Sequence, residues 1–300
     1  MQKLLLAIFA MATLVLTSCS STTDEVLDPV IEQEQQTHIN LHLGFSTSES
    51  AWTPTRALSA TAADISRIAL TIFDATGAKV IEQSQYKTDA DFGTFQDLRL
   101  TPGTYTFAIV AHKAATTEEA PATISSATSA TLSGQYFLDT YATTQTVTIQ
   151  ANATQDVPLT VPLCVTRLQI NTLDKLPSDV QTITLTINPT ATAPSALTFN
   201  PTTGLFPTAS RFTRTLNVSS AVGKTFGIFI NFMADAYPAT ADVLVEARNA
   251  SGDLVATRTF TDLTFHRAKI RTIQSYLFSG TTSTTLTFEE WTSEDPITIE

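Results

Sequence analysis

Cys19 is the residue whose type and surroundings point most directly to covalent chemistry. It follows Leu-Thr-Ser at residues 16–18, and these close an apolar run that begins after Lys3. This order is typical of a secretory signal that ends in a bacterial lipobox, where the cysteine becomes the acylated first residue after cleavage. The alternative is a simple signal peptide with an incidental cysteine. We expect a signal peptide over residues 1–18 and lipidation of Cys19.

The bond between Arg56 and Ala57 is a second candidate, in this case as the substrate of a protease. Arg56 is the only basic residue in the stretch 46–64, which is rich in Ser, Thr and Ala. An exposed Arg-Ala bond in a loop of this kind can be bound in extended form and cut by a trypsin-like protease. The alternative is a single solvated arginine in a connection.

The other polar residues form no pattern of catalysis or ligand coordination. His38 and His42 lie on one expected strand, about 13 Å apart at its rise per residue, which is too far to share a metal ion. Residues 223–225, Gly-Lys-Thr, imitate the end of a phosphate-binding loop, but Val218 stands where its first glycine should be. The serines lie in no nucleophile motif. We therefore expect no enzyme activity, no metal and no cofactor.

The composition favours a β protein that does not bind nucleic acid. The formal net charge is −11, which would repel a phosphate backbone. Charged residues make up only 15% of the chain, and threonine, which favours strands, is abundant. A chain of 300 residues is long enough for two ordinary domains with cores of their own.

Apolar and polar residues alternate in many short stretches, which predicts strands that bury one face. Gly77 ends a predicted turn over residues 74–77, and Pro102 and Gly103 are expected to form the two corners of another turn. Residues 114–131 are expected to be loop or a weakly formed helix. The alternating stretches are 39–45, 68–73, 105–111, 157–163, 183–187 and 243–247.

Two stretches also predict a place within a sheet. Residues 226–232 are nearly all apolar, which is typical of a fully buried central strand. Pro158 and Pro162 remove donors from one side of the stretch 157–163 and predict an edge strand. Cys164, the only cysteine besides Cys19, is expected to pack as a small hydrophobe.

These elements divide the chain into four predicted parts. After the signal peptide, residues 19–36 are polar and acidic, as expected of a solvated tether. Strand signals then recur at the spacing of β-sandwiches and predict two such domains, residues 37–163 and 164–300. The expected fold class is all-β.

The order of these features resembles the fimbrillins of Bacteroidales type V pili. The resemblance is carried by the lipobox, the tether, the first strand, the loop with Thr-Arg-Ala-Leu at 55–58, and the runs 68–77 and 100–107. It also includes the closing segments 286–291 and 297–299. It implies two transthyretin-like β-sandwich domains in tandem, and a structural subunit of a cell-surface fimbria that serves adhesion.

The resemblance further implies assembly by strand exchange at the outer membrane. A protease would cut between Arg56 and Ala57, the first strand (39–45) would leave, and a strand of another subunit would fill the groove. The implied donor is the segment 285–300, with the apolar residues Leu286, Phe288, Trp291, Ile297 and Ile299. Base members of the family keep their lipid and are not cut, so the role as shaft, anchor or accessory subunit stays open.

The implied partners are other fimbrial subunits, in a homo- or heteropolymer, the membrane through the lipid, and ligands on host or bacterial surfaces. An alternative function from a different class is a surface glycan-binding lipoprotein. That function needs exposed aromatic platforms, for which Trp52 and Trp291 are the candidates.

Overall fold

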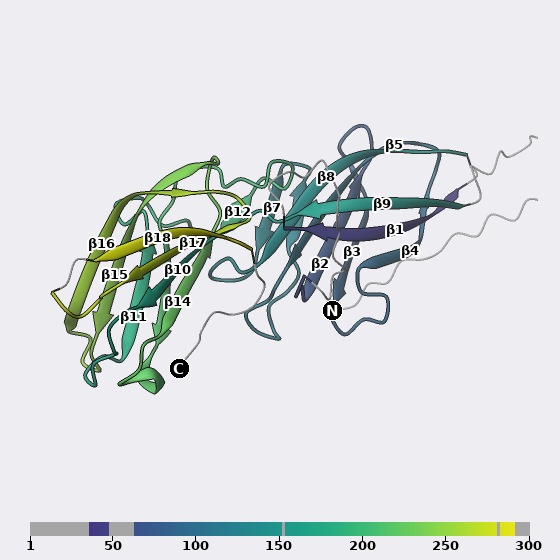
Figure 1. Ribbon diagram of the computed structural model, residues 1–300. Coiled ribbons are helices and arrows are strands. Elements are labelled where there is room, and N and C mark those ends of the chain that lie inside the picture. The colour runs from purple at the N-terminus through teal and green to yellow at the C-terminus, as the bar shows by residue number, and fades with distance from the viewer. Residues whose placement is uncertain (1–35, 48–62, 152–153, 281–282, 292–300) are drawn as a thin grey trace, which may run out of the picture. The chain divides into compact units, whose positions relative to one another are not determined.

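The computed structural model describes residues 36–47, 63–151, 154–280 and 283–291. These ranges consist of strands and connecting segments, with one short 3-10 helix, η1 (Ser219–Ala221) (Figure 1). No helix within them is long and apolar enough to cross a lipid bilayer. The all-β prediction is confirmed. The strands are β1 (Thr37–Ser46), β2 (Arg67–Phe73), β3 (Lys79–Tyr86), β4 (Thr94–Leu100), β5 (Gly103–His112), β6 (Thr123–Ser126), β7 (Ser129–Leu132), β8 (Thr140–Ile149), β9 (Thr154–Pro162), β10 (Thr166–Thr172), β11 (Thr182–Ile187), β12 (Leu197–Phe199), β13 (Phe212–Asn217), β14 (Gly227–Phe232), β15 (Ala239–Arg248), β16 (Leu254–Phe265), β17 (Lys269–Ser275) and β18 (Thr284–Glu290).

The first two sheets are built from strands that precede residue 163. One sheet has the order β4-β1-β9 and the other the order β3-β2-β5-β8. Phe45 on β1 and Tyr141 on β8 meet edge to face, with ring centroids 5.4 Å apart. Since these rings come from different sheets, the two sheets pack face to face around a shared apolar layer, as in a β-sandwich.

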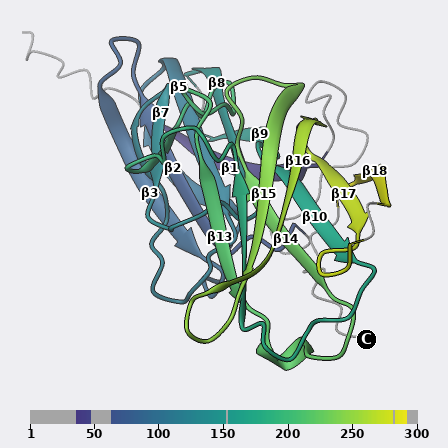
Figure 2. The same ribbon diagram turned by 90° about the vertical axis from the view of Figure 1, so that its left-hand side faces the viewer.

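Two further sheets follow in the chain, with the orders β14-β10-β17-β18 and β13-β11-β15-β16. Phe232 of the first of these sheets contacts Phe212 and Phe265 of the second, at centroid distances of 6.1 and 5.0 Å. This pair of sheets therefore encloses an apolar layer as well. Figure 2 shows β18 beside β17 at the outer edge of its sheet.

A small sheet of order β12-β7-β6 joins segments from both sides of residue 163. β12 pairs with β7 from Leu197 opposite Leu132 to Phe199 opposite Ala130. Phe137 packs against Phe199 with centroids 6.3 Å apart. Main-chain pairing thus crosses the border that we predict between residues 163 and 164, and the described residues on both sides of it belong to one compact unit. The division into two domains at that border stays a prediction.

Three local predictions require comment. Gly77 has φ +85°, as its predicted turn requires, and that turn is confirmed. The prediction for Gly103 was wrong, because this residue begins β5 and lies opposite Ile149 of β8. The stretch 114–131 contains strands rather than a helix, since Ile124 and Ala130 turn their side chains into the core and β12 supplies a distant partner for β7.

The stretches 157–163 and 226–232 were each predicted to have a particular place in a sheet, and the two outcomes differ. β9 is an edge strand, as the two prolines predict. β14 is fully buried but lies at the edge of its sheet, so its predicted central position was wrong. Other segments cover that edge: Phe137 forms an isolated bridge with Asn231, and the Arg214 guanidinium donates to the Phe229 carbonyl at 3.0 Å. Burial therefore comes from tertiary contacts instead of a second neighbouring strand.

Candidate strand-exchange site

β1 is an inner strand that pairs with one neighbour in antiparallel and with the other in parallel orientation. It is antiparallel to β4, from Thr37 opposite Leu100 to His42 opposite Thr94, with a bulge between Ile39 and Leu41. It is parallel to β9 throughout residues 38–46. Figure 1 shows β1 between these two strands.

The side chains of β1 separate cleanly into two faces. Ile39, Leu41 and Phe45 are completely buried, and Leu43 is nearly so. On the other face, the Asn40 amide donates to Asp156 of β9 at 3.1 Å, and His38 forms a hydrogen bond with Asp97 of β4. The apolar side chains thus hold β1 in the core, while the polar side chains fix its register against both neighbours.

The energy of this placement can be estimated from the buried side chains. Full burial of one large aliphatic or aromatic side chain contributes about 1.5–3 kcal/mol, so the four apolar side chains of β1 contribute on the order of 6–12 kcal/mol. The net stability of a whole domain is about 5–15 kcal/mol. A chain without β1 would also expose unpaired main-chain groups of β4 and β9. The groove left by β1 would therefore favour occupation by another strand of similar pattern.

β18, unlike β1, is exposed and lies at the edge of its sheet. It pairs with β17 on one side, from Lys269 opposite Glu290 to Ser275 opposite Thr284, and it is the last strand of its sheet. All seven of its residues are exposed. Among the described residues no strand pairs with its outer edge. Little apolar area therefore opposes its release, and its free edge can accept a further strand.

Two apolar residues of β18 are partly exposed on its surface. Leu286 and Phe288 each keep about two fifths of their area in contact with solvent, 43% and 44%. The Arg271 guanidinium lies 4.2 Å from the centroid of the Phe288 ring, and the His266 ring meets that ring edge to face at 5.0 Å. Phe288 is thus held by cation–π and aromatic contacts at the surface and is not part of the core.

Trp291, directly after β18, is buried against a cluster of polar residues. Its Nε1 donates to the Asp139 carboxylate at 3.4 Å, and Arg167 forms an ion pair with the same carboxylate at 3.1 Å. The Asn231 amide also donates to Asp139, at 3.2 Å, and accepts from Arg167 at 2.9 Å. Burial raises the pKa of the Asp139 carboxyl, and Arg167 and the N–H donors oppose that shift.

This cluster, which we call the Asp139 cluster, was not predicted from the sequence. Its four residues, Asp139, Arg167, Asn231 and Trp291, come from segments far apart in the chain. The Arg167 guanidinium also stacks over the rings of Phe229 and Trp291, at 4.5 and 4.7 Å from their centroids. No local signal marks Arg167, because it alternates with the apolar residues of β10 as a solvent-facing residue would.

Several of the predicted site residues lie outside the described ranges. These are the lipidation candidate Cys19, the cleavage pair Arg56 and Ala57, and the last two donor residues, Ile297 and Ile299. Leu286, Phe288 and Trp291 are described, and the structure separates them: the first two lie on the exposed strand and the third is buried. Within the described ranges, no group of three or more His, Cys, Asp or Glu residues is placed to hold a metal ion.

The fold places the chain in the class of all-β proteins built from face-to-face sheets, with one strand held between two others and one exposed at a sheet edge. The family of fimbrillin-A associated anchor proteins Mfa1 and Mfa2 matches residues 33–231 of the chain. The chain belongs to this family, whose members are structural proteins of cell-surface fimbriae and are not a known class of enzyme. It is thus a fimbrial protein, as the sequence resemblance implies. No curated protein matches the chain in sequence.

Several solved structures are similar to the chain. A candidate polysaccharide-binding protein (DUF1812) from Bacteroides thetaiotaomicron has 10% identity and a TM-score of 0.52, covering 85% of this chain and 98% of its own. The fimbrial anchor protein Mfa2 from Porphyromonas gingivalis has 12% identity and a TM-score of 0.48, with the same coverage. The tip fimbrial protein Mfa3 from Porphyromonas gingivalis has 14% identity and a TM-score of 0.45, covering 85% of this chain and 100% of its own.

Proposed function

We propose that this chain is carried to the outer membrane by a lipid on Cys19 and joins a neighbouring fimbrial subunit by strand exchange at the β1 position. A cut between Arg56 and Ala57 would release β1 together with the lipid. A chain that is cut would serve as a shaft or accessory subunit, and a chain that stays uncut would hold the fimbria to the membrane as an anchor. Either role serves adhesion through the assembled fimbria.

The position of β1 is the observation that carries this proposal. It is an inner strand whose apolar face is fully buried, yet the chain leaves it through the stretch 48–62, in which Arg56 lies. One cut in that stretch would disconnect β1 from all of the sheet partners that hold it. A strand from another subunit with apolar residues at the same period would restore both the core and the main-chain pairing.

The donor in this proposal is the segment 285–300, of which β18 is the described part. β18 is exposed along its whole length, so releasing it from β17 loses main-chain pairing and little apolar burial. Trp291 is the exception, because its release breaks contacts with the Asp139 cluster. Donation would therefore be coupled to the opening of that cluster.

A peptide exchange experiment tests the acceptor half of the proposal. The mature chain is treated with limiting trypsin, and the products are identified by mass spectrometry and N-terminal sequencing. We expect cleavage after Arg56 and, after it, uptake of a fluorescent peptide with the sequence of residues 37–46. A peptide with Leu41→Asp should bind at least about tenfold more weakly, since it places a charge in the core.

The matched control is the Arg56→Gln protein, which should resist cleavage at this bond and take up no peptide. Equal uptake of the two peptides, or uptake by the uncut protein, would contradict exchange at the β1 position. The N-terminal residue of the protein on the cell surface then separates the roles, since Ala57 marks a cut subunit and acylated Cys19 marks an anchor. Loss of labelled palmitate in Cys19→Ser tests the lipid.

The alternative of glycan binding through the two tryptophans finds less support. Trp52 lies outside the described ranges. Trp291 is only 7% exposed and donates to Asp139, so its ring is not available as a stacking platform. Strand exchange explains the placement of β1 and β18, and it is the function that we propose.

A further inference from the structure

We propose that a hollow beside Tyr136 binds a saccharide that carries a carboxylate. The hollow has a volume of about 370 Å³ and is lined by the segments 134–136 and 193–197 and by the start of β13, from Arg211 to Thr213. Its size lies within the range of small-molecule sites, about 300–1,000 Å³. None of its lining residues belongs to β1 or β18, although Asn231 of the Asp139 cluster is among them, and the inference does not depend on strand exchange.

Arg211 gives the hollow its charge. Within the part of the chain that the structure describes, it is the only charged residue that lines the hollow, and its side chain is exposed. Among the described residues its guanidinium has no hydrogen bond and no ion pair; only its backbone N–H is bonded, to Thr192. A guanidinium presents parallel N–H donors that match the two oxygens of a carboxylate. In a chain of net charge −11, an arginine without an acidic partner is therefore a notable local attraction for an anion.

Beside the apolar residues of segments 193–197 and 211–213, the hollow has polar lining groups that can bond to a sugar. Gln135, Ser195 and Thr213 line the hollow with exposed amide and hydroxyl groups, and none of these groups bonds within the described part of the chain. Amide and hydroxyl groups can both donate and accept, as the hydroxyl groups of a sugar do. Tyr136 adds an aromatic ring, whose face can pack against the C–H groups of a sugar ring.

Tyr136 is held in place before any ligand arrives. The Arg214 guanidinium lies 5.3 Å from the centroid of its ring and is itself held by the Phe229 carbonyl. The next residue, Phe137, is fully buried and bridges to Asn231. The segment that carries Tyr136 is thus anchored to the core, so little ordering entropy remains to be lost on binding.

A second hollow of about 480 Å³ adjoins the first along residues 134–136. It is lined by Glu118 and Glu119, whose negative charges would repel an anionic group, and the exposed Glu118 carboxylate can accept from sugar hydroxyls. The charges therefore orient the ligand. Its acidic sugar belongs in the hollow with Arg211, and a neutral sugar follows in the hollow with the two glutamates.

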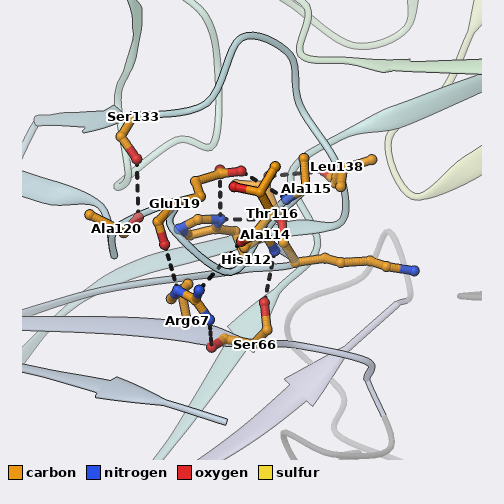
Figure 3. A network of polar contacts seen from close by, with 12 residues as sticks. Ser66, Arg67, His112, Ala114, Ala115, Thr116, Glu119, Ala120, Ser133 and Leu138 are labelled. Carbon is orange, nitrogen blue, oxygen red and sulfur yellow. Dashed lines mark hydrogen bonds and ion pairs between the residues drawn. The ribbon is translucent and has the colours of Figure 1, made fainter. Parts of the chain in front are cut away.

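The wall of the second hollow is fixed by the polar network in Figure 3. Arg67 of β2 donates to the carbonyls of Glu119 and Thr117, at 2.6 and 2.7 Å, and thereby holds the loop against the sheet. The Glu119 carboxylate accepts from the Ala115 N–H at 2.8 Å. Gly134 lies so close that a Cβ there would be 2.7 Å from the Glu119 carboxylate. The loop that forms this wall is thus held in place by the fold.

A matched pair of disaccharides tests the inference. Cellobiuronic acid and cellobiose differ only in a carboxylate at one end, and both are titrated against the full mature chain by calorimetry or ligand-observed NMR. We expect the acid to bind at least about tenfold more tightly than cellobiose, the usual effect of a charge-assisted hydrogen bond. Arg211→Gln should abolish this preference, and Tyr136→Leu should weaken both sugars.

Arg99→Gln is the control, because Arg99 is also exposed but lies on β4, away from the hollow. It should leave binding unchanged, and the thermal unfolding of all variants is compared to verify their fold. Equal affinity for the two sugars, or an acid preference that survives Arg211→Gln, overturns the inference. So does a result in which a peptide with a free C-terminal carboxylate binds through Arg211 while neither sugar binds.

Discussion

The indole Nε1 of Trp291 lies 3.4 Å from Oδ2 of Asp139, although the two residues are 152 positions apart in the chain. Asp139 directly precedes β8, and Trp291 directly follows β18. Arg167 forms an ion pair with this carboxylate and stacks on the indole. The end of the exposed strand β18 is therefore fastened to a buried polar cluster, while the strand itself is held mainly by its pairing with β17.

Replacement of Trp291 should loosen β18 more than replacement of any exposed residue on the strand. Loss of a large buried aromatic side chain costs about 3–5 kcal/mol, so Trp291→Ala is expected to lower the free energy of unfolding by about 3 kcal/mol. Amide hydrogen exchange in β18 should become faster, because its end is no longer fastened. Urea denaturation and hydrogen exchange measure the two effects.

Phe288→Ala is the control for this prediction, since Phe288 is 44% exposed. It should cost about 1 kcal/mol or less, through the loss of its contacts with Arg271 and His266. If both variants lose the same stability, Trp291 has no special role in holding β18. Exchange of β18 as slow in Trp291→Ala as in the parent would have the same meaning.

The buried His112 should make stability fall in mild acid. Burial, together with the nearby Arg67 charge, lowers its pKa to about 4, although its bond to the Lys113 carbonyl opposes this shift. The unfolded state, with a histidine pKa of about 6.5, binds the proton first, so stability present above pH 6.5 is lost as the pH falls toward 4. Between pH 7 and pH 5 we expect a loss of about 2 kcal/mol in urea unfolding.

His112→Gln should remove most of this pH dependence, because its amide can still donate to the Lys113 carbonyl but does not titrate. His42→Gln is the matched control, since His42 is exposed on β1 and should leave the pH dependence as it is. An unchanged slope between pH 7 and pH 5 in His112→Gln would show that other groups cause the loss. The comparison needs only the difference between variants, which cancels the titration of the remaining carboxylates.

Gly204 is a position where two independent reasons exclude a larger side chain. Its φ is +63°, and a Cβ would lie 2.7 Å from Cys164 Sγ and 3.2 Å from a guanidinium nitrogen of Arg267. Gly204→Ala should therefore cost about 2 kcal/mol or more, from left-handed strain and from the clash. Calorimetric or urea unfolding measures the change.

A double-mutant cycle separates the two causes. Cys164→Ala removes the nearest atom, so the alanine at 204 should cost about 1 kcal/mol less in that background. Gly223→Ala serves as the reference for strain alone, because Gly223 also has positive φ, +77°, and no atom lies within 4 Å of its added Cβ. If the losses of stability caused by Gly204→Ala and Cys164→Ala simply add, the alanine at position 204 does not clash with the Cys164 sulfur.

The thiol of Cys164 should be inert in the folded protein. The side chain is fully buried, and burial raises its pKa to about 11, so almost no thiolate is present at pH 8. We expect alkylation by iodoacetamide to begin only when urea unfolds the chain. Rapid alkylation in native buffer would show that the core around Cys164 opens readily.

The sequence by itself was sufficient for the local elements. The alternation in residues 39–45 and 183–187 is found as β1 and β11, because a strand buried on one face must place apolar residues at every second position. The turn at Gly77 followed from the backbone freedom of glycine, and the edge position of β9 from the missing donors of its prolines. The lipidation of Cys19 and the cut at Arg56 remain sequence predictions.

Other features were decided by contacts that no local pattern encodes. β14 reads as a central strand, yet it lies at an edge that Phe137 and Arg214 cover. Trp291 reads as one more apolar donor residue, but Asp139, Arg167 and Asn231 enclose it. No pattern in the sequence distinguishes Arg211 from other arginines. It lines a hollow only because the fold brings segments 134–136 and 193–197 together beside it. Periodicity reports the burial of a side chain, whereas the partner across a sheet or a core is chosen by distant segments whose register depends on the whole fold.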